Sequence, residues 1–476
     1  MKKSQVLAEK LKNQIEHNIW LSGEKLPSIR NACKRYKLSI ETVLQAYQQL
    51  EAAGYIYAKP KSGYFVLPRR NALTGSESNS KAITPYSVRI SDLLYDVLQK
   101  AKDPSIIPLS SAFPDPSLFP HQALSRSLAS ASRQMPDNSM LTNLPPGNQT
   151  LRRQIAQRYQ VNGLNVLPDD IVITSGAMEA LSLCLQSCTE PGDLVAIEYP
   201  AFYGVLQTIE RLNLTAVEIP TDPETGIDLD VLSSVFSSMD IKACWFMTAA
   251  QNPVGYSMSS ENKQRLAQLV NHHNVPMIED DVYRELFVGS DSSLPAKAYD
   301  KNENILLCGS FSKSLSPGFR IGWVVAGQQA LKIQRLQHLA TLSSSIPIQL
   351  ALSHYLTYYS YDNHLKKLRK VLHERKQNHI SLLTNCLPSD TVIHQTQGGY
   401  FIWIELPKNV CVETLYDKAL EHNISVAPGI IFSGDKRFNH HIRLNSSYAC
   451  DDKITQAIKT LGELVSELSN DKRESV

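Results

Sequence analysis

The chain has 476 residues, 42% of them hydrophobic and 20% charged, which is ordinary for a globular protein with room for two or more domains. No apolar stretch approaches the ~20 residues of a membrane span, and the N-terminus lacks an apolar signal core, so we expect no membrane partner and a cytoplasmic location. The eight cysteines form no CxxC pair, so neither a disulfide framework nor a metal site is predicted.

Charge is unevenly distributed along the chain. The net charge is +2, but residues 1–70 hold nine Lys and four Arg against five Glu and no Asp, a formal +8 that leaves −6 on the remainder. A basic head on an acidic body is typical of a nucleic-acid-binding module fused to a metabolic domain. A well-solvated first domain gives the same pattern, so charge alone leaves both interpretations open.

The first 70 residues predict a winged helix-turn-helix. Apolar residues at helical spacing, a Pro-Ser helix start and a final Gly indicate three helices, and two aromatic-rich runs indicate a hairpin. The helices are expected near 4–19, near 28–36 and from the turn at 37–39 to Gly54, and the strands at 55–59 and 64–66.

The run LPSIRNACKRYKLSIETVLQAYQQLEAAGYIYAKPKSGYFV resembles the GntR-type DNA-binding head, and this resemblance covers residues 1–70. It implies that the third helix enters the major groove of a double-stranded operator and that the wing approaches the minor groove. The implied DNA contacts are Arg30, Ser39, Thr42 and Lys61. Arg30 offers a forked donor for phosphate or guanine, whereas Ser39 is also expected to cap the third helix.

The head departs from the family pattern at one place. GntR-type heads usually carry an Arg directly after the Ser that starts the recognition helix, and this chain has Ile40 followed by Glu41. The change removes one familiar DNA contact and adds a negative charge, so the operator sequence does not carry over from the family.

Residues 71–87 predict a flexible linker. Their middle is rich in Ser, Asn and Gly and almost free of apolar side chains, so it cannot bury enough surface to order itself.

Residues 88–470 predict one large α/β domain. Short runs that are apolar on both faces alternate with helical segments, which is typical of a mostly parallel sheet covered by helices on both sides. The runs are 171–174, 194–197, 244–247, 276–278, 305–307 and 323–325. Residues suited to chemistry follow these runs, at the strand ends where such sheets bind ligands.

Lys313 lies in the most informative stretch, Gly309-Ser310-Phe311-Ser312-Lys313-Ser314-Leu315-Ser316-Pro317-Gly318-Phe319-Arg320. An amine among hydroxyls, with an Arg seven residues later, suits a lysine that forms an imine with an aldehyde cofactor whose phosphate is held nearby. The alternative is a surface lysine, which this run disfavours.

Five other signals are weak one by one. Ala177 and Met178 open a helix after a small-residue turn, Phe202 follows a strand, and Asn252 precedes Pro-x-Gly. Each has a plain structural interpretation as a turn or a core residue. Two more are Asp280 with Tyr283 at a strand end, where a buried acid needs a cationic partner, and the late Arg443, whose fork suits a carboxylate.

Taken in order, these residues resemble a fold type I aminotransferase dependent on pyridoxal 5'-phosphate (PLP), over about residues 105–450. The fold implied is a mostly parallel sheet with helices on both faces and a smaller C-terminal α+β subdomain. The resemblance implies that Lys313 bonds the cofactor, Asp280 keeps its ring nitrogen protonated, and Arg443 binds an amino-acid carboxylate. It gives the other contacts to Asn252 and Tyr283 at the phenolate oxygen, Phe202 on the ring, and Ser310, Ser312, Arg320 and the N–H groups of Ala177 and Met178 at the phosphate.

The whole order of head, linker and body resembles the MocR group of regulators, which implies a homodimer.

One departure concerns catalysis. Aminotransferases commonly carry a Tyr five residues before the Gly of a PPG segment, and here Gly147 is preceded at that distance by Thr142. The departure puts full transamination in doubt, whereas imine exchange at Lys313 does not depend on that Tyr.

Three functions remain to be weighed. The favoured one is a transcription regulator that senses an amine or amino acid through imine exchange at Lys313. The alternatives are an active PLP-dependent aminotransferase with a vestigial head, and a DNA-binding protein whose body only dimerises. Intact Lys313, Asp280 and Arg320 argue against the last, and the intact wing argues against the aminotransferase.

Overall fold

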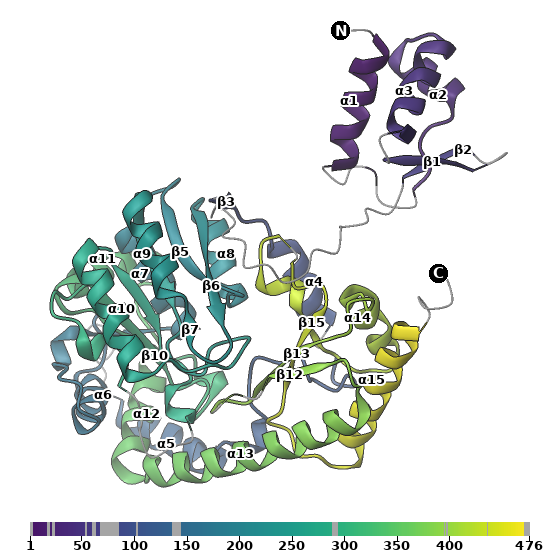
Figure 1. The fold of residues 1–476 in the computed structure, drawn as a ribbon. Coiled ribbons are helices and arrows are strands. Elements are labelled where there is room, and N and C mark those ends of the chain that lie inside the picture. The colour runs from purple at the N-terminus through teal and green to yellow at the C-terminus, as the bar shows by residue number, and fades with distance from the viewer. Residues whose placement is uncertain are drawn as a thin grey trace. The chain divides into compact units, whose positions relative to one another are not determined.

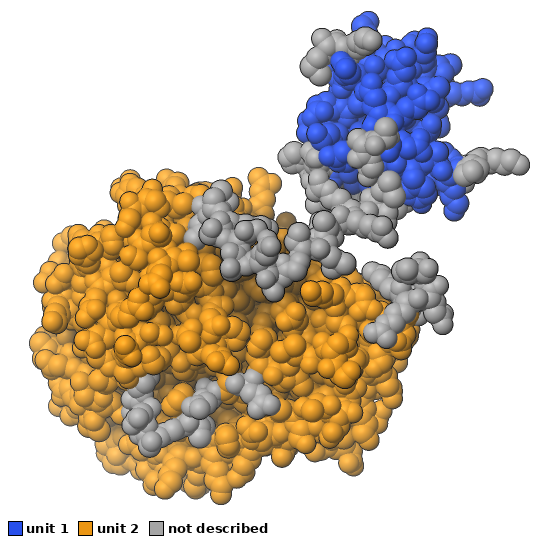
Figure 2. Space-filling view, in the orientation of Figure 1, with its two compact units in different colours: residues 1–81 blue, residues 82–476 orange. Residues whose placement is uncertain are grey.

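The computed structural model describes residues 3–16, 20, 24–52, 55–59, 63–66, 85–100, 103–135, 144–287, 294–394, 396, 398–435 and 437–470. It divides into two compact units, Met1–Lys81 and Ala82–Val476 (Figure 2). Most of the expected linker, together with Lys61 and Thr142, lies outside the described residues. The last two linker residues form strand β3 (Tyr86–Ser87), so the ordered body begins earlier than predicted.

The first unit is a three-helix domain with a two-stranded hairpin. Its elements are α1 (Lys3–Glu16), α2 (Ile29–Tyr36), α3 (Ile40–Ala52), β1 (Ile56–Lys59) and β2 (Gly63–Val66). Leu11, Val43 and Tyr47 are fully buried at its core, and the Tyr47 hydroxyl donates to the carbonyl of Pro27 over 2.8 Å. Lys37, at φ +54°, ends α2 in the left-handed conformation and makes the predicted turn.

The second unit is built on a nine-stranded sheet (Figure 1). The strand order is β3-β6-β5-β8-β9-β10-β11-β4, with β7 paired to β6. The pairs that join β6, β5, β8, β9 and β10 are parallel, whereas β11 runs antiparallel to both β10 and β4. The strands are β4 (Ile171–Thr174), β5 (Leu194–Tyr199), β6 (Thr215–Asp222), β7 (Gly226–Ile227), β8 (Ile241–Phe246), β9 (Met277–Asp280), β10 (Ile305–Ser310) and β11 (Gly322–Val325).

Helices cover both faces of this sheet, as predicted from strands that are apolar on both sides. On one face α7 (Ala177–Cys188), α8 (Tyr203–Arg211) and α11 (Ala330–Ala340) bury Val195, Ile197 and neighbouring side chains. The other face contributes to two further apolar clusters, whose helices include α6 (Gln149–Val161), α9 (Leu229–Ser238), α10 (Ser260–His273) and α12 (Ile346–Tyr358).

A smaller α+β part completes the unit. Its four-stranded antiparallel sheet has the order β12-β13-β15-β14. The elements are β12 (Val392–His394), β13 (Phe401–Glu405), α14 (Val412–Glu421), β14 (Ala427–Pro428), β15 (His441–Asn445) and α15 (Asp452–Asn470). The 26-residue helix α13 (Tyr361–Cys386) leads into it and packs against α15 and β13. Helices α4 (Ser91–Lys100) and α5 (His121–Gln134) lie between β3 and β4 in the chain. Among the described residues, no helix has the length and apolar content needed to cross a membrane.

Candidate functional site

The ten residues predicted to contact a cofactor line one cavity of about 170 Å³ in the second unit. They are Ala177, Met178, Phe202, Asn252, Asp280, Tyr283, Ser310, Ser312, Lys313 and Arg320. The cavity lies at the carboxyl ends of β4, β5, β8, β9 and β10. These strands point the same way in the sheet, so the loops that follow them meet at one edge.

Lys313 lines this cavity and is half-buried, and its amine has aromatic and backbone neighbours. Nζ donates to the carbonyl of Ala112 over 2.7 Å and lies 4.0 Å from the ring centre of Phe113 and 5.5 Å from that of Tyr283. Burial, aided by the nearby positive charge of Arg443, lowers the pKa of Lys313 from 10.5 to about 7. The amine is therefore available as a nucleophile near neutral pH.

Asp280 is the acid at the end of β9. It is 1% exposed, and burial raises its pKa to about 7, with a hydrogen bond from the Val282 N–H acting in the opposite direction. A carboxyl held this way gains a favourable interaction when a cationic group comes to rest beside it. A protonated pyridine nitrogen is such a group.

The loop after β10 and the start of α7 form an anion cradle. Gly176 (φ +98°) precedes the first turn of α7, where the N–H groups of Ala177 and Met178 lie at the helix start. A Cβ on Gly176 would lie 2.5 Å from Nη2 of Arg320, so only glycine lets the guanidinium approach this turn. Arg320 also donates to the hydroxyl of Ser312 over 3.4 Å.

Asn252 and Arg443 are joined at the edge of the cavity. Nη1 of Arg443 donates to Oδ1 of Asn252 over 2.7 Å, and Nη2 donates to the carbonyl of Ser110. Arg443 is 1% exposed and stacks over Phe401 and Phe432, and it does not itself line the cavity. Arg443 therefore contacts a lining residue of the cavity, Asn252, and its contact with a ligand stays a prediction.

The donor set of the cavity fits PLP. Nδ2 of Asn252 is buried with no hydrogen-bond acceptor among the described residues, so it is a donor without a partner at the cavity wall. The same cavity offers a half-buried amine, a buried acid and the guanidinium of Arg320. The amine suits the aldehyde of PLP, and the acid suits its ring nitrogen. Asn252 suits the phenolate oxygen, and Arg320 suits the phosphate.

Several lining residues were not anticipated from the sequence. Phe113, Tyr203 and Gln207 line the cavity, and the Ala112 carbonyl accepts from both Lys313 and Tyr400. Tyr203 could have been found as the first helical residue after Phe202. The Ala112 carbonyl has no side-chain signal, because any residue type could supply it.

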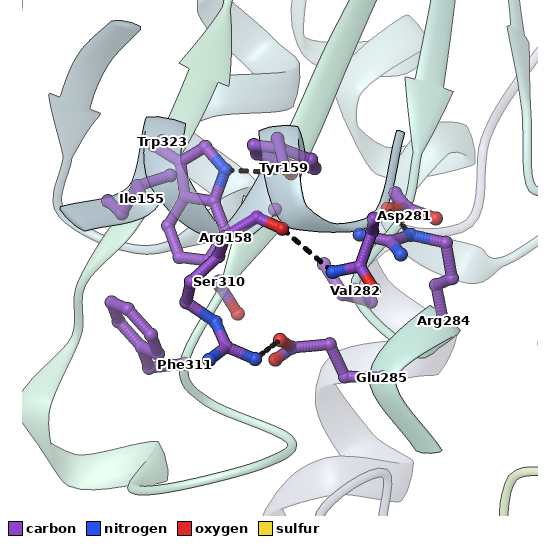
Figure 3. Close-up of a pocket in the computed structure, with 12 residues that line it drawn as sticks. Ile155, Arg158, Tyr159, Asp281, Val282, Arg284, Glu285, Ser310, Phe311 and Trp323 are labelled. Carbon is purple, nitrogen blue, oxygen red and sulfur yellow. Dashed lines mark hydrogen bonds and ion pairs between the residues drawn. The ribbon is translucent and has the colours of Figure 1, made fainter. Parts of the chain in front are cut away.

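A second, smaller cavity of about 20 Å³ is lined in part by Ser310 and Phe311, which come shortly before Lys313 in the chain (Figure 3). Its lining combines the aromatic side chains Tyr159, Phe311 and Trp323 with the ion pair of Arg158 and Glu285. Ser310 and Val282 line both cavities, so the two share a wall.

In the first unit, three of the four expected DNA contacts are described. Arg30 and Ser39 are exposed, and Thr42 is half-buried. The Ser39 hydroxyl accepts the Thr42 N–H over 3.3 Å, which confirms the predicted cap of α3, and it shares a 2.8 Å hydrogen bond with the Thr42 hydroxyl.

Comparison with known proteins finds two families in the chain. Residues 110–461 match Aminotransferase class I and II, and residues 3–66 match the gntR family of bacterial regulatory proteins. The chain is 48% identical to the HTH-type transcriptional regulator YdcR of Escherichia coli (strain K12), over 98% of this chain and 100% of that protein. It is 33% identical to YjiR of the same strain, over 98% and 99%.

A similar fold occurs in the crystal structure of Pyrococcus horikoshii kynurenine aminotransferase in complex with PMP. The TM-score is 0.73 at 26% identity, and the match covers 80% of this chain and 95% of that one.

Proposed function

Since the chain belongs to the regulators that join a GntR-type head to a class I and II aminotransferase domain, the MocR-type architecture, we propose that it binds PLP at Lys313 and senses a small amine or amino acid there. One observation carries the proposal. All ten residues assigned to this cofactor line a single cavity, although they come from segments far apart in the chain.

The residues of the cavity have distinct tasks in this proposal. When bound, PLP supplies an aldehyde carbon to which either the Lys313 amine or a ligand amine can bond. Burial lowers the pKa of Lys313 to about 7, so about half of the amine is unprotonated near neutral pH. Asp280 holds a proton on the ring nitrogen, because its buried carboxylate is stabilised by a positive neighbour.

The remaining contacts orient the cofactor. Asn252 and Tyr283 donate to the phenolate oxygen, and Phe202 packs against the ring. Ser310, Ser312, Arg320 and the first N–H groups of α7 bind the phosphate, supported by the close approach of Arg320 to Gly176.

Arg443 gives the effector its chemical class. Its guanidinium contacts Asn252, which lines the cavity, and a planar fork suits a carboxylate. We therefore favour an amino acid over a simple amine.

In this proposal the head binds DNA. Arg30, Ser39, Thr42 and Lys61 contact operator DNA in this proposal, and the +8 charge of residues 1–70 attracts the duplex. An effector changes DNA binding only by its different affinity for two arrangements of the protein.

The proposal includes a homodimer. Leu331, Leu339 and Leu342, on α11 and just after it, are 57%, 83% and 55% exposed. Exposed apolar side chains close together in the chain are typical of a surface that a second copy covers.

An active aminotransferase is the second candidate. It is favoured because all ten residues assigned to the cofactor, including Lys313 and Asp280, line one cavity. Steady production of keto acid from an amino acid would support it, whereas a protein that only exchanges its amine partner would not turn over.

We expect the purified protein with PLP to show a visible absorption band that one class of amino acid perturbs. The same amino acid should change the protein's affinity for operator DNA, and that affinity should fall with salt because phosphate contacts release counterions. Absorption titration and electrophoretic mobility shift measure the two effects. A protein that stays colourless with PLP would contradict the proposal.

The rate at which Lys313 combines with PLP should depend on pH around 7. Because the pKa of Lys313 is lowered to about 7, protonation below that pH removes the nucleophile, and the rate should fall about tenfold per pH unit. Above it the rate should level off, as stopped-flow absorption would show. A rate that keeps rising past about pH 9 would indicate an ordinary, solvated lysine.

A further inference from the structure

The residue after the lysine is held from two sides by the first turn of α13. The Ser314 hydroxyl lies 2.6 Å from the Tyr361 hydroxyl, and Nε2 of His364 lies 2.7 Å from the Ser314 carbonyl. A carbonyl only accepts, so Nε2 carries the proton in that bond. Ser314 and Tyr361 are 2% and 3% exposed.

These hydrogen bonds have a definite direction. The Tyr361 hydroxyl donates to Oε2 of Glu285 over 2.6 Å, which uses its only proton. Ser314 must therefore donate to the Tyr361 oxygen. The chain of donors runs from the lysine loop outward to a carboxylate.

That carboxylate remains charged. Burial alone would raise the pKa of Glu285, but the Arg158 guanidinium and the Tyr361 hydroxyl outweigh it and hold the pKa below its ordinary value. Figure 3 shows Arg158 meeting Glu285 in the small cavity, over 2.8 Å. The Arg158 guanidinium also lies 4.3 Å from the ring centre of Tyr361. The ring of Tyr361 is thus held by Arg158 and its hydroxyl by Glu285.

Helix α13 connects this network to the part of the protein that carries Arg443. Its first residue is Tyr361, and along its length it packs against β13 and α15 (Figure 1). Strand β13 pairs with β15, where Trp403 lies opposite Arg443. One helix thus holds the neighbour of the reactive lysine and packs on the sheet of the proposed carboxylate-binding arginine.

We propose that Tyr361 and Glu285 are positioning residues for Lys313: they hold Ser314, and through it set the place and the proton affinity of the lysine amine. Neither touches the amine. The inference rests on the proposed function, because it concerns the lysine that would bond PLP. It adds a second layer of residues, which the cofactor contacts do not include.

The charged groups around the amine predict the direction of the effect. Asp280 of β9 favours the protonated amine, whereas Arg320 and Arg443 of β15 disfavour it, and the Tyr283 ring lies beside it. Burial is nevertheless the main cause of its lowered pKa. A loosened loop admits water, so the pKa of Lys313 should rise toward 10.5.

The test compares Tyr361→Phe, Ser314→Ala and the double variant with the wild type, with Tyr358→Phe as the matched control because Tyr358 is 72% exposed. The first readout is the labelling of Lys313 by acetic anhydride at a series of pH values, in protein without cofactor, quantified by mass spectrometry. The second is the pH titration of the absorption band with PLP. Each single variant should change the proton affinity of Lys313 by about threefold to tenfold, and the double variant by no more than the larger single effect.

Three results would overturn the inference. They are an unchanged labelling midpoint in Tyr361→Phe, an effect equal to that of Tyr358→Phe, and additive effects in the double variant. If Tyr361→Phe does not fold, Ser314→Ala decides by the same criterion. The labelling needs no cofactor, so a wild type that never binds PLP overturns the proposed function while the positioning of Lys313 is still judged.

Discussion

Lys313→Ala is expected to abolish the absorption band with PLP and the response of DNA binding to the effector. The variant removes the only amine that lines the cavity among the described residues, so no lysine there can bond the aldehyde. Operator binding without effector should remain, because the head is a separate compact unit. Absorption spectra, borohydride trapping with mass spectrometry, and mobility shifts measure these outcomes.

The matched control is Lys366→Ala, since Lys366 is exposed on α13. It should keep both the band and the effector response. A band that persists in Lys313→Ala, with borohydride trapping at another lysine, would show that the reactive amine has been misassigned. An effector response that survives without a band would favour a body that works without PLP.

Arg320→Ala should weaken PLP binding by about 10- to 100-fold, because a hydrogen bond to a charged group contributes about 1.5–3 kcal/mol. Arg320 is the one guanidinium that lines the cavity among the described residues, and it approaches the glycine turn at the start of α7. Equilibrium titration of the absorption band gives the affinity.

Arg320→Lys separates charge from geometry. Arg320 has φ +51°, and both replacements meet the same backbone cost there. Lys keeps the charge but not the fork, so its loss should be smaller than that of Ala. Arg335→Ala, at an exposed position of α11, should bind PLP as the wild type does. Equal affinity in Arg320→Ala and the wild type would remove Arg320 from the phosphate site.

Six strands of the large sheet were predicted from the sequence, whereas several other strands were not. Strand β4 was predicted over the residues it occupies, and β5, β8, β9, β10 and β11 were predicted to within a few residues. These strands are apolar on both faces, and all except β11 are followed by residues suited to chemistry, which is a second signal. Strands β6 and β13 had no such ending residue and were not predicted. Strand β3 is two residues long and exists only by pairing with β6, so no local pattern marks it.

The site shows the same limit. Lys313, Asp280 and Arg320 were predicted because their types and spacing suit one cofactor, and the structure brings them together. The pairing of Arg443 with Asn252 joins residues 191 positions apart, so no local motif could give it. The link from Ser314 through Tyr361 to Glu285 was also missed, because each of the three is ordinary on its own.

The antiparallel pairing of β10 with β11 has a consequence for ligand choice. Ser310 lies opposite Gly322, so residues 311–321 form a closed loop that carries both Lys313 and Arg320. Because its two ends are paired, the loop limits how far apart the amine of Lys313 and the guanidinium of Arg320 can lie. In the proposed PLP site, this separation favours an aldehyde that carries an anion at a matching distance from its carbonyl. Unphosphorylated pyridoxal would reach the amine of Lys313 but would have no phosphate for the guanidinium of Arg320.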